Sequence, residues 1–309
     1  MTAITRVAFA IFVFTSAGGV QAAEYFVSPS GDDANPGTAA KPWRTVDKAN
    51  RVLQAGDTVF LRQGSYRDPI APARSGSGEN ARITYAAYPG EHPEINRGDV
   101  LRGWEKVSGT DGVNAIYRRR STFHDKNQLV EDDLDKAGIY AMYWNRSYIT
   151  TRIVKDLNRI DRPGDYYYSN GYWYVRTSDS RSPDTHKITE IVDDREGIYV
   201  DDHQYITING IAIRFVGRFV DAHNAKHITL EGCTLEYARG YGGLGIVGGS
   251  KYWIVRNNKI RGVGTILGHR GDAFWIQNSD HGLYEGNDLS YYGHLGVQVR
   301  DTHDNVVRH

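Results

Sequence analysis

Apolar and polar residues alternate in a repeated pattern in the last third of the chain. Four segments share an alternating start, a Gly or Asn at the fifth residue and a second short apolar run. These fifth residues are spaced by 22, 25 and 29 positions and are Gly210, Gly232, Asn257 and Gly286. One turn of a parallel β-helix needs a repeat of this size, because its three short strands pair with the next turn at about 4.8 Å. The pattern therefore predicts an all-β solenoid.

The unequal spacing of the repeats indicates that the extra residues lie in loops. We place these loops at residues 214–219, 237–243 and 261–272. Length changes on one side of a solenoid commonly build its binding face. The pairs at 257–258 and 286–287 suit left-handed turn positions and stacked asparagines, so we interpret them as structural.

A further strand in each repeat also alternates, which separates inward from outward side chains. The inward positions are Val220, Ala222, Phe274, Ile276, Val297 and Val299. The outward positions form a polar and aromatic ladder of Asp221, His223, Trp275, Gln277, Gln298 and Arg300. The repeat between them contributes Gly245 and Gly248-Gly249, which either open room for a ligand or mark tight turns.

The start of the chain has a different order of elements. An apolar strand at 25–27 precedes a turn-rich loop, a helix-like stretch at 45–53 and apolar strands at 59–61 and 83–85. Ala55-Gly56-Asp57 ends the helical pattern. This order predicts an N-terminal helical cap on a stack of strands.

The middle of the chain does not follow the repeat pattern. A hairpin is predicted where 166–168 connects through Asn170-Gly171 to 172–174. Together with an arginine run at 118–120, this hairpin indicates an inserted β module. The module either packs against the solenoid only or grips a substrate.

The first 22 residues have the layout of a secretory signal. Arg6 precedes an apolar run from Val7 to Phe14, and small residues lead to Ala22. The run is too short to span a membrane. We expect cleavage near Ala23 or Glu24, a secreted or periplasmic protein and no membrane contact after cleavage; an uncleaved anchor is the alternative. The expected organisation is a signal at 1–22, cap and first rungs at 23–102, the inserted module at 103–192 and rungs at 193–309.

The composition narrows the choice of partners. The 37 basic and 37 acidic residues balance, which argues against nucleic acid or an anionic membrane as the main partner. The 34 glycines and 21 tyrosines are typical of a turn-rich β protein with aromatic surface. The single cysteine, Cys233, has no internal disulfide partner, and we interpret it as a core thiol. We expect a monomer.

A fifth rung begins at residues 305–309, where the sequence stops. A solenoid normally closes with a cap, because an open rung exposes strand edges and core side chains. We therefore expect this chain to be a C-terminally truncated member of its family.

Two stretches resemble a known family. The N-terminal segment is similar to that of secreted right-handed β-helix carbohydrate-active proteins, a pectate-lyase-like group that includes glycosidases, in Tyr25–Gly31, Asn35–Thr38, Lys41–Trp43, Ala55–Thr58 and Gly64–Tyr66. Trp173–Arg176 and Ser182–Asp184 resemble insertions in some β-helix glycosidases. The resemblance implies a right-handed parallel β-helix and a carbohydrate partner. The N-terminal segment carries none of the catalytic residues.

The loops before the outward strands are rich in bases and aromatics, at 268–272 and 291–294. A polyuronate lyase needs a base for the proton next to the carboxylate, cations for that carboxylate and an acid for the leaving oxygen. We assign His269 or His294 as base, Arg270 and Arg300 as carboxylate clamps and Tyr292 as acid. The substrate-binding set is Asp221, His223, Trp275, Gln277, Asp272 and Gln298. The alternative is that these side chains have no functional role and are solvated or stacked on aromatic rings.

A glycoside hydrolase is the second hypothesis. It needs two carboxylates, about 5 Å apart for retention or about 6.5 to 9.5 Å apart for inversion. Asp221 and Asp272 are two rungs apart and would be separated by about 9.6 Å if they share a column. Asp301 is a third candidate. A non-catalytic glycan-binding or surface β-helix protein is the third hypothesis.

The sequence does not support a dense calcium site, although Ca²⁺ is compatible with the separated Asp221, Asp272 and Asp301. No phosphate-binding glycine loop, nucleophile elbow or zinc-spaced Cys/His set is present. The best-supported interpretation is an exported right-handed parallel β-helix with an N-terminal helical cap and an inserted β module. We expect it to be an enzyme that cleaves an acidic polysaccharide by β-elimination.

Overall fold

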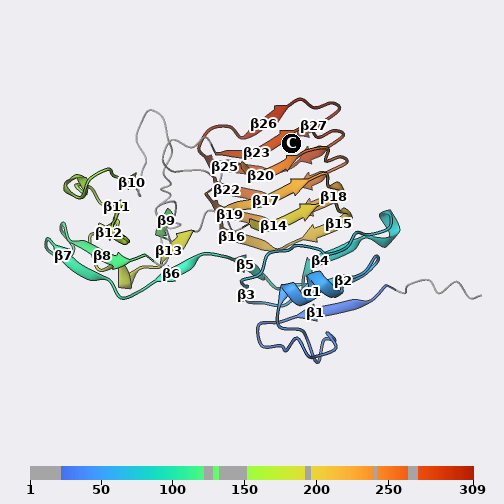
Figure 1. Ribbon diagram of the computed structural model, residues 1–309, viewed down its shortest axis with the longest axis horizontal. Coiled ribbons are helices and arrows are strands. Elements are labelled where there is room, and N and C mark those ends of the chain that lie inside the picture. Colours follow the sequence, from blue (N-terminus) through green and yellow to red (C-terminus); the bar gives the residue numbers. More distant parts are fainter. Residues whose placement is uncertain (1–21, 122–127, 132–151, 192–195, 240–241, 264–270) are drawn as a thin grey trace, which may run out of the picture.

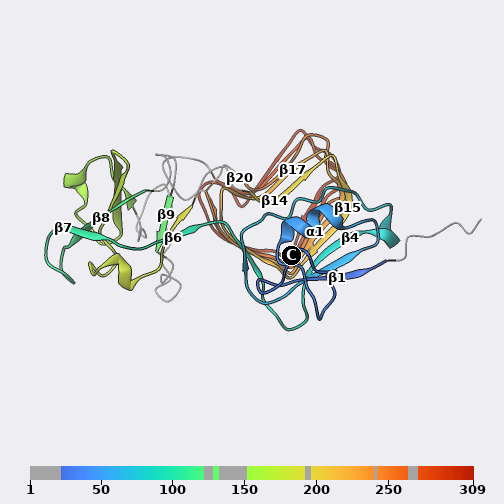
Figure 2. The same ribbon diagram turned by 60° about the horizontal axis from the view of Figure 1, so that its bottom comes forward.

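The computed structural model describes residues 22–121, 128–131, 152–191, 196–239, 242–263 and 271–309 (Figure 1). Three parallel sheets run along a solenoid, and an antiparallel module stands to one side of it (Figures 1 and 2). Consecutive strands of each repeat belong to different sheets, and equivalent strands of successive repeats pair. The stack of rungs that the repeat predicts is therefore confirmed.

Each of the three sheets is named here by number. Sheet 1 has eight strands: β1 (Glu24–Val27), β2 (Thr58–Leu61), β4 (Ile83–Ala87), β15 (Gln204–Asn209), β18 (Lys226–Glu231), β21 (Ile254–Arg256), β24 (Leu283–Glu285) and β27 (Val306–Arg308). Sheet 2 has six: β3 (Ser65–Tyr66), β5 (Glu94–Asn96), β16 (Ala212–Val216), β19 (Thr234–Ala238), β22 (Lys259–Val263) and β25 (Asp288–Tyr292). Sheet 3 has five: β14 (Glu196–Asp201), β17 (Arg218–His223), β20 (Gly242–Val247), β23 (Asp272–Gln277) and β26 (Val297–Arg300).

The bends between strands are made by columns of residues in the left-handed region. The fifth residues of the four repeats form one column, with φ of 69° at Gly210, 63° at Gly232, 55° at Asn257 and 61° at Gly286. Gly and Asn tolerate this region best, which is why they recur there. Behind the column, the Asn258 side-chain amide donates to the Asn287 carbonyl oxygen at 3.0 Å. The structural interpretation of these pairs is confirmed.

In a second column of residues with left-handed backbone conformation, tyrosine and histidine stand where Gly or Asn would be expected. It contains Tyr205, His227, Tyr252 and His281, all with φ between 54° and 58°. The rings stack on one another with centroids 4.4, 4.7 and 5.0 Å apart. Stacking between rungs therefore accompanies a backbone conformation that such residues rarely adopt.

One continuous core fills the solenoid. The predicted inward residues Val220, Ala222, Phe274 and Ile276 are at most 1% exposed. Val297 is partly buried, whereas Val299 is 45% exposed. Val299 pairs with the inward Ile276, so its predicted direction is confirmed, and it is exposed because β26 is the edge strand of sheet 3 and is paired on one side, to β23.

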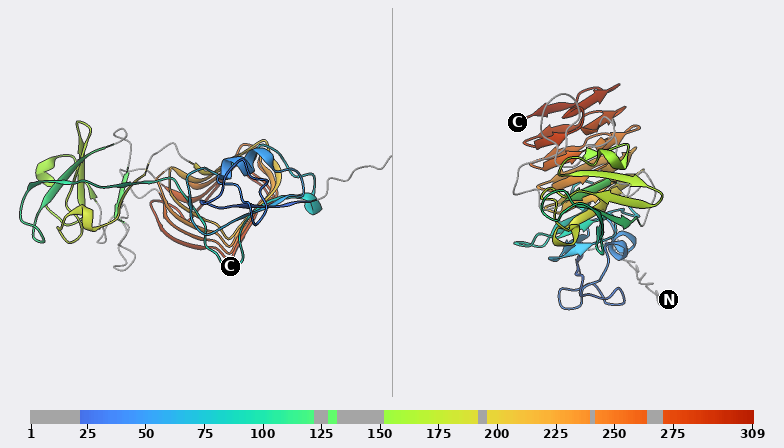
Figure 3. Two further views of the ribbon diagram at one scale, coloured as in Figure 1. Left: turned by 90° about the horizontal axis from the view of Figure 1, so that it is seen from below. Right: turned by 90° about the vertical axis from the view of Figure 1, so that its left-hand side faces the viewer.

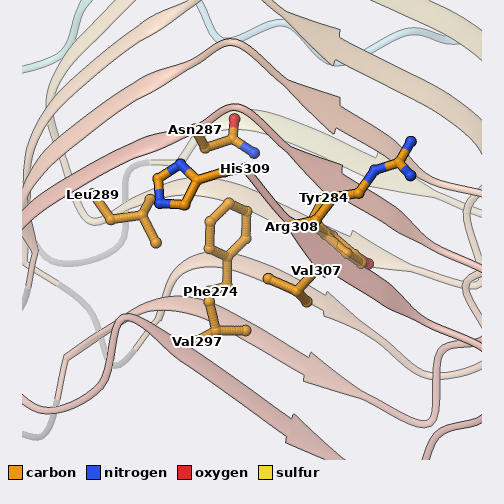
Figure 4. Close-up of a pocket in the computed structure, with 8 residues that line it drawn as sticks. All are labelled: Phe274, Tyr284, Asn287, Leu289, Val297, Val307, Arg308 and His309. Atoms are coloured by element: carbon orange, nitrogen blue, oxygen red, sulfur yellow. The ribbon is translucent and has the colours of Figure 1, made fainter.

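Between the last described rungs the core has a hollow of about 250 Å³. Figure 4 shows that it is lined by Phe274, Tyr284, Asn287, Leu289, Val297, Val307, Arg308 and His309. The lining is mostly apolar and continues the core of the lower rungs.

The helix expected at residues 45–53 is α1 (Val46–Val52). Thr45 caps it, since its hydroxyl accepts a hydrogen bond from the Lys48 backbone N–H at 3.1 Å. Val46 and Ala49 are fully buried in the solenoid core. The apolar face of this short helix is therefore part of the same core as the first strands.

The inserted module lies between β5 and β14 in the chain. It consists of two sheets in which most neighbouring strands are antiparallel. One joins β6 (Asp99–Leu101), β13 (Ile188–Ile191) and β9 (Gln128–Glu131); the other joins β10 (Arg152–Ile153), β11 (Asp165–Ser169), β12 (Tyr172–Val175), β8 (Ile116–Arg120) and β7 (Glu105–Ser108). The predicted hairpin is β11 paired with β12. Trp173 is fully buried in the module core, where its indole N–H donates to Glu190 Oε1 at 2.8 Å.

Strand β13 anchors the module to the solenoid, beside which the module lies in Figure 3. All four residues of β13 are buried. Ile188 belongs to the module core, whereas Ile191 packs with Phe215 and Tyr237 of sheet 2. The module starts at Asp99, four residues before the start expected from sequence.

Two sequence expectations concern single features of the described chain. Cys233 is a buried free cysteine, and burial raises the pKa of its thiol to about 12, so it is a core thiol. Within the described ranges, the helices are all too short or too polar to cross a membrane.

Candidate functional site

The outward side chains of sheet 3 form two columns along the solenoid. The Asp221 column contains Tyr199, Asp221, Gly245, Trp275 and Gln298 in register. The His223 column contains Asp201, His223, Val247, Gln277 and Arg300. The ladder predicted from alternation is therefore confirmed as a geometric arrangement.

A compact polar cluster lies on β14 and β17. Arg218 Nη1 donates to Asp221 Oδ1 at 2.9 Å, and His223 Nε2 lies 3.3 Å from the same oxygen. The Asp221 side chain is 16% exposed and the His223 side chain 49%. Tyr199 precedes Asp221 by one rung in the same column. The nearby Asp201 carboxylate raises the pKa of the Tyr199 hydroxyl. The cluster thus combines a carboxylate, an imidazole, a guanidinium and a phenol that stays protonated at neutral pH.

Gly245 opens a notch beside this cluster. A Cβ at Gly245 would lie 3.5 Å from the Val220 carbonyl oxygen and 3.7 Å from Asp221 Oδ1, which is ordinary contact distance. The strand therefore has space for a side chain that the sequence does not supply. On the far side of the notch, the Arg218 guanidinium carbon lies 5.9 Å from the centre of the Trp275 ring. An aromatic wall, a cation and a carboxylate thus border one opening.

A second polar pair lies at the start of β23. His294 Nδ1 is hydrogen-bonded to Asp272 Oδ1 at 2.8 Å, and the Leu295 backbone N–H donates to the same oxygen at 3.0 Å. Asp272 is only 4% exposed, whereas the His294 side chain is 33% exposed. Asp272 therefore orients the imidazole and reaches a ligand only through it.

Asp221 and Asp272 do not share a column. Asp272 pairs with Gly242, while the residue of β23 in the Asp221 column is Trp275. The shared-column expectation is therefore wrong, because β23 begins three residues earlier than that arrangement requires. Asp301 has φ of 51° and lies at a left-handed corner after β26, not on the face of the sheet.

Of the predicted lyase set, the structure describes His294, Tyr292 and Arg300. Tyr292 pairs with Val263 and packs against the core, so it lies in an inward column of sheet 2. Arg300 is in the His223 column on β26, three strand spacings from His223, or roughly 14 Å. Within the described part of the chain Arg300 has no ion-pair partner. His269 and Arg270 lie outside the described residues.

Comparison with known proteins places the fold in a family. Residues 25–149 match the model of the Pel9A-like right-handed β-helix region, and residues 196–309 match that of the right-handed β-helix region. The chain is a right-handed β-helix protein. The handedness and the fold class inferred from the sequence are confirmed.

Several known proteins are similar to parts of the β-helix protein. The uncharacterized protein YwoF of Bacillus subtilis (strain 168) is 36% identical over 104 residues, which cover 34% of this chain and 20% of YwoF. The structure of XylC with xylose is 15% identical with a TM-score of 0.57, covering 90% of this chain and 64% of that one. Pectate lyase Pel9A is 15% identical with a TM-score of 0.43, covering 86% and 50%. The chain thus spans 64% of the XylC structure and a fifth of YwoF.

The described residues of the β-helix protein do not fit a calcium ion. They contain no group of three or more His, Cys, Asp or Glu side chains arranged to hold a metal. Asp221 is paired with the Arg218 cation, and Asp272 is buried against His294. Calcium prefers several oxygen ligands around one point, and these carboxylates do not supply that cage.

Two residues of the cluster, Arg218 and Tyr199, were not predicted from the sequence. Arg218 falls in a segment that was interpreted as loop, but it is the first residue of β17. Tyr199 belongs to β14, which lies before the first aligned repeat. Extending the alternation of 220–223 backwards by one rung would have placed Tyr199 beside Asp221.

Proposed function

We propose that this β-helix protein cleaves an acidic polysaccharide by β-elimination on sheet 3. The observation that carries the proposal is the position of Arg218, whose guanidinium lies between the Asp221 carboxylate and the Trp275 ring at the Gly245 notch. A cation beside a partly exposed aromatic ring suits a sugar that bears a carboxylate. His223 on the strand of Asp221 offers an imidazole, and Tyr199 on the strand beyond it offers a protonated phenol.

The polysaccharide would follow the solenoid axis. The two outward columns of sheet 3 cross five strands, and each strand adds about 4.8 Å. A pyranose unit is about as long as one such step, so successive sugars can contact successive rungs. Trp275 provides a stacking surface, and Gln277, Gln298 and Arg300 provide polar contacts further along. Arg300 is available for a second carboxylate.

The cluster supplies the three groups that β-elimination needs. Arg218 neutralises the sugar carboxylate, which makes the proton on the adjacent carbon more acidic. His223 accepts that proton, the electron pair of the broken C–H bond forms a carbon–carbon double bond to the neighbouring carbon, and the bond from that carbon to the leaving oxygen breaks. Tyr199 donates a proton to the leaving oxygen. Asp221 holds Arg218 and His223 in place.

A glycoside hydrolase is the second candidate, and one observation favours it. Asp201 and Asp221 lie on neighbouring rungs and two residues apart along the strand, so their Cα atoms are roughly 8 Å apart. Both side chains point outward from the sheet, so their carboxyl groups can reach the separation of about 6.5 to 9.5 Å that inverting enzymes use. Asp201 thus replaces Asp272 as the partner of Asp221 in the hydrolase hypothesis.

An activity screen separates the two reactions. The purified protein would be tested on polygalacturonate, alginate, glycosaminoglycans and neutral glycans, with ultraviolet absorbance and reducing ends followed together. The lyase proposal expects absorbance to rise with reducing ends and to be abolished by His223→Ala. His294→Ala is the comparison that tests the other imidazole.

Three outcomes contradict the lyase proposal. Reducing ends without absorbance, lost in Asp201→Asn and Asp221→Asn, would establish the hydrolase. Absorbance that His294→Ala abolishes and His223→Ala preserves would move the base to the Asp272 pair. Binding without turnover on any substrate would indicate a glycan-binding protein.

A further inference from the structure

The larger sheet of the inserted module has one covered and one open face. Side chains alternate along β12, where Trp173 and Val175 are buried and Tyr172 and Tyr174 are partly exposed. The covered face packs onto β6, β9 and β13 through Leu101, Leu129 and Ile188. The other face therefore points away from the module core.

Five residues on the open face form what is called here the tyrosine face: Tyr167, Tyr172, Tyr174, Arg118 and Arg120. Tyr167 pairs with Tyr174 across the strands, and their ring centres are 6.1 Å apart. Tyr174 pairs in turn with Arg118, and Tyr172 with Arg120. The Arg118 guanidinium carbon lies 5.4 Å from the centre of the Tyr172 ring. Three tyrosines and two arginines thus share one face of three neighbouring strands.

The charges on this face leave one cation unpaired. Glu105 on β7 accepts a hydrogen bond from Arg118 Nη2 at 3.1 Å, but its side chain is 69% exposed and Arg118 is 41% exposed. Such an open ion pair is held weakly and can be replaced by another carboxylate. Arg120 is exposed and has no ion-pair partner in the part of the chain that the structure describes. The face therefore complements a ligand that carries negative charge.

We propose that the tyrosine face is a second glycan-binding surface, which holds a carboxylate-bearing polysaccharide away from sheet 3. Tyrosine rings present an apolar face and a polar tip, and both match a sugar ring with its C–H surface and hydroxyls. The row of Tyr167, Tyr174, Arg118 and Glu105 crosses four strands, or roughly 14 Å. That length accommodates a short run of sugar units. The surface binds independently of any turnover on sheet 3.

Affinity electrophoresis of the full chain tests this surface. The protein would be run in native gels that contain polygalacturonate or, as the neutral probe, dextran. We expect retardation by polygalacturonate, and an apparent Kd that rises at least tenfold in Tyr167→Ala/Tyr174→Ala. Arg120→Gln removes only a surface charge and should raise the Kd several-fold, which covers the case in which the double variant misfolds.

Matched controls separate this surface from the proposed catalytic site. Tyr252→Ala removes an exposed tyrosine of the solenoid corner, which is 45% exposed, and should leave retardation unchanged. Arg218→Gln should lower turnover by about 100-fold while retardation persists, so that failure of the enzyme proposal leaves this one standing. The inference is overturned if Arg120→Gln and a folded double variant are both retarded like wild type. It is also overturned if polygalacturonate does not retard the wild-type protein, or if dextran retards it equally.

Discussion

Sheets 1 and 3 both consist of parallel strands in register, but they differ in how their outward charges are paired. On sheet 1, a column of Glu231, Arg256, Glu285 and Arg308 alternates in sign along four successive strands. Arg256 bonds to Glu231 and Arg308 to Glu285, each at 2.9 Å. The charges of this face are satisfied within the face.

Sheet 3 lacks this internal balance. On its outward face Asp221 pairs with both Arg218 and His223, and Arg300, the aromatic Trp275 and a glycine at 245 lie on the following strands. Arg300 has no partner of opposite charge among the described residues, and Gly245 leaves open the space that a side chain would fill. Two sheets with the same backbone repeat can therefore differ in whether their outward charges pair within the sheet.

The largest expected effect comes from substituting one paired arginine on each of the two sheets and comparing the activities. Arg218→Gln on sheet 3 should lower kcat/KM on the acidic polysaccharide by about 100-fold, or about 2.7 kcal/mol, because the substrate carboxylate loses its counter-charge. Arg256→Gln removes a similarly paired arginine from sheet 1 and should leave kcat/KM within twofold. Steady-state ultraviolet assays on both variants provide the measurement. Equal losses in the two variants would remove the distinction between the faces.

Arg82 tests the structural role of sheet 1. Its guanidinium donates to the Ile206 carbonyl oxygen at 2.8 Å, to Thr207 Oγ1 at 2.8 Å and to Thr229 Oγ1 at 3.1 Å, and it also bonds to the His227 carbonyl. Arg82→Met should lower the free energy of unfolding by about 1–3 kcal/mol, because these acceptors lose their donor. Urea denaturation measures this change, and activity of the folded variant should not move. A variant as stable as wild type would show that the clamp is dispensable.

The smallest expected effect concerns Glu91 and pH. Hydrogen bonds from Arg62, which follows β2 of sheet 1, lower the pKa of the Glu91 carboxyl. A lowered pKa stabilises the fold above the unfolded value of roughly 4.3 and loses that contribution as pH falls through the folded pKa. Glu91→Gln should therefore unfold at lower urea than wild type at pH 7, with a smaller difference near pH 3. A pH-independent difference would show that the charge is not involved.

Much of the fold could be predicted because the solenoid repeats its requirements. Gly210, Gly232, Asn257 and Gly286 recur because each rung needs a left-handed residue at the same corner. The alternation in 220–223 and 274–277 followed from one face being buried. The corner of Tyr205, His227, Tyr252 and His281 recurs at the same spacing, but tyrosine and histidine do not by themselves indicate a left-handed residue, so its conformation could not be predicted.

The site was less predictable because it depends on register across loops of unequal length. The hydrolase hypothesis considered Asp272 two rungs from Asp221 in a shared column, but the start of β23 places Asp272 three residues from that column. Tyr292 was expected in a polar loop, yet it falls in the column that Val263 occupies in the core. Neither shift can be calculated from spacing alone, since loop residues add length without fixing where the next strand begins.

Gly245→Val tests the central claim, that the notch on sheet 3 is where the polysaccharide reacts. Valine suits an outward strand position, and its Cβ would meet only ordinary contacts, so the melting temperature should stay within a few degrees of wild type. The account predicts that kcat/KM on the acidic polysaccharide falls at least tenfold, because the side chain fills the space between Asp221 and Trp275. Full activity in a stable Gly245→Val protein would contradict it and move the reaction away from this notch.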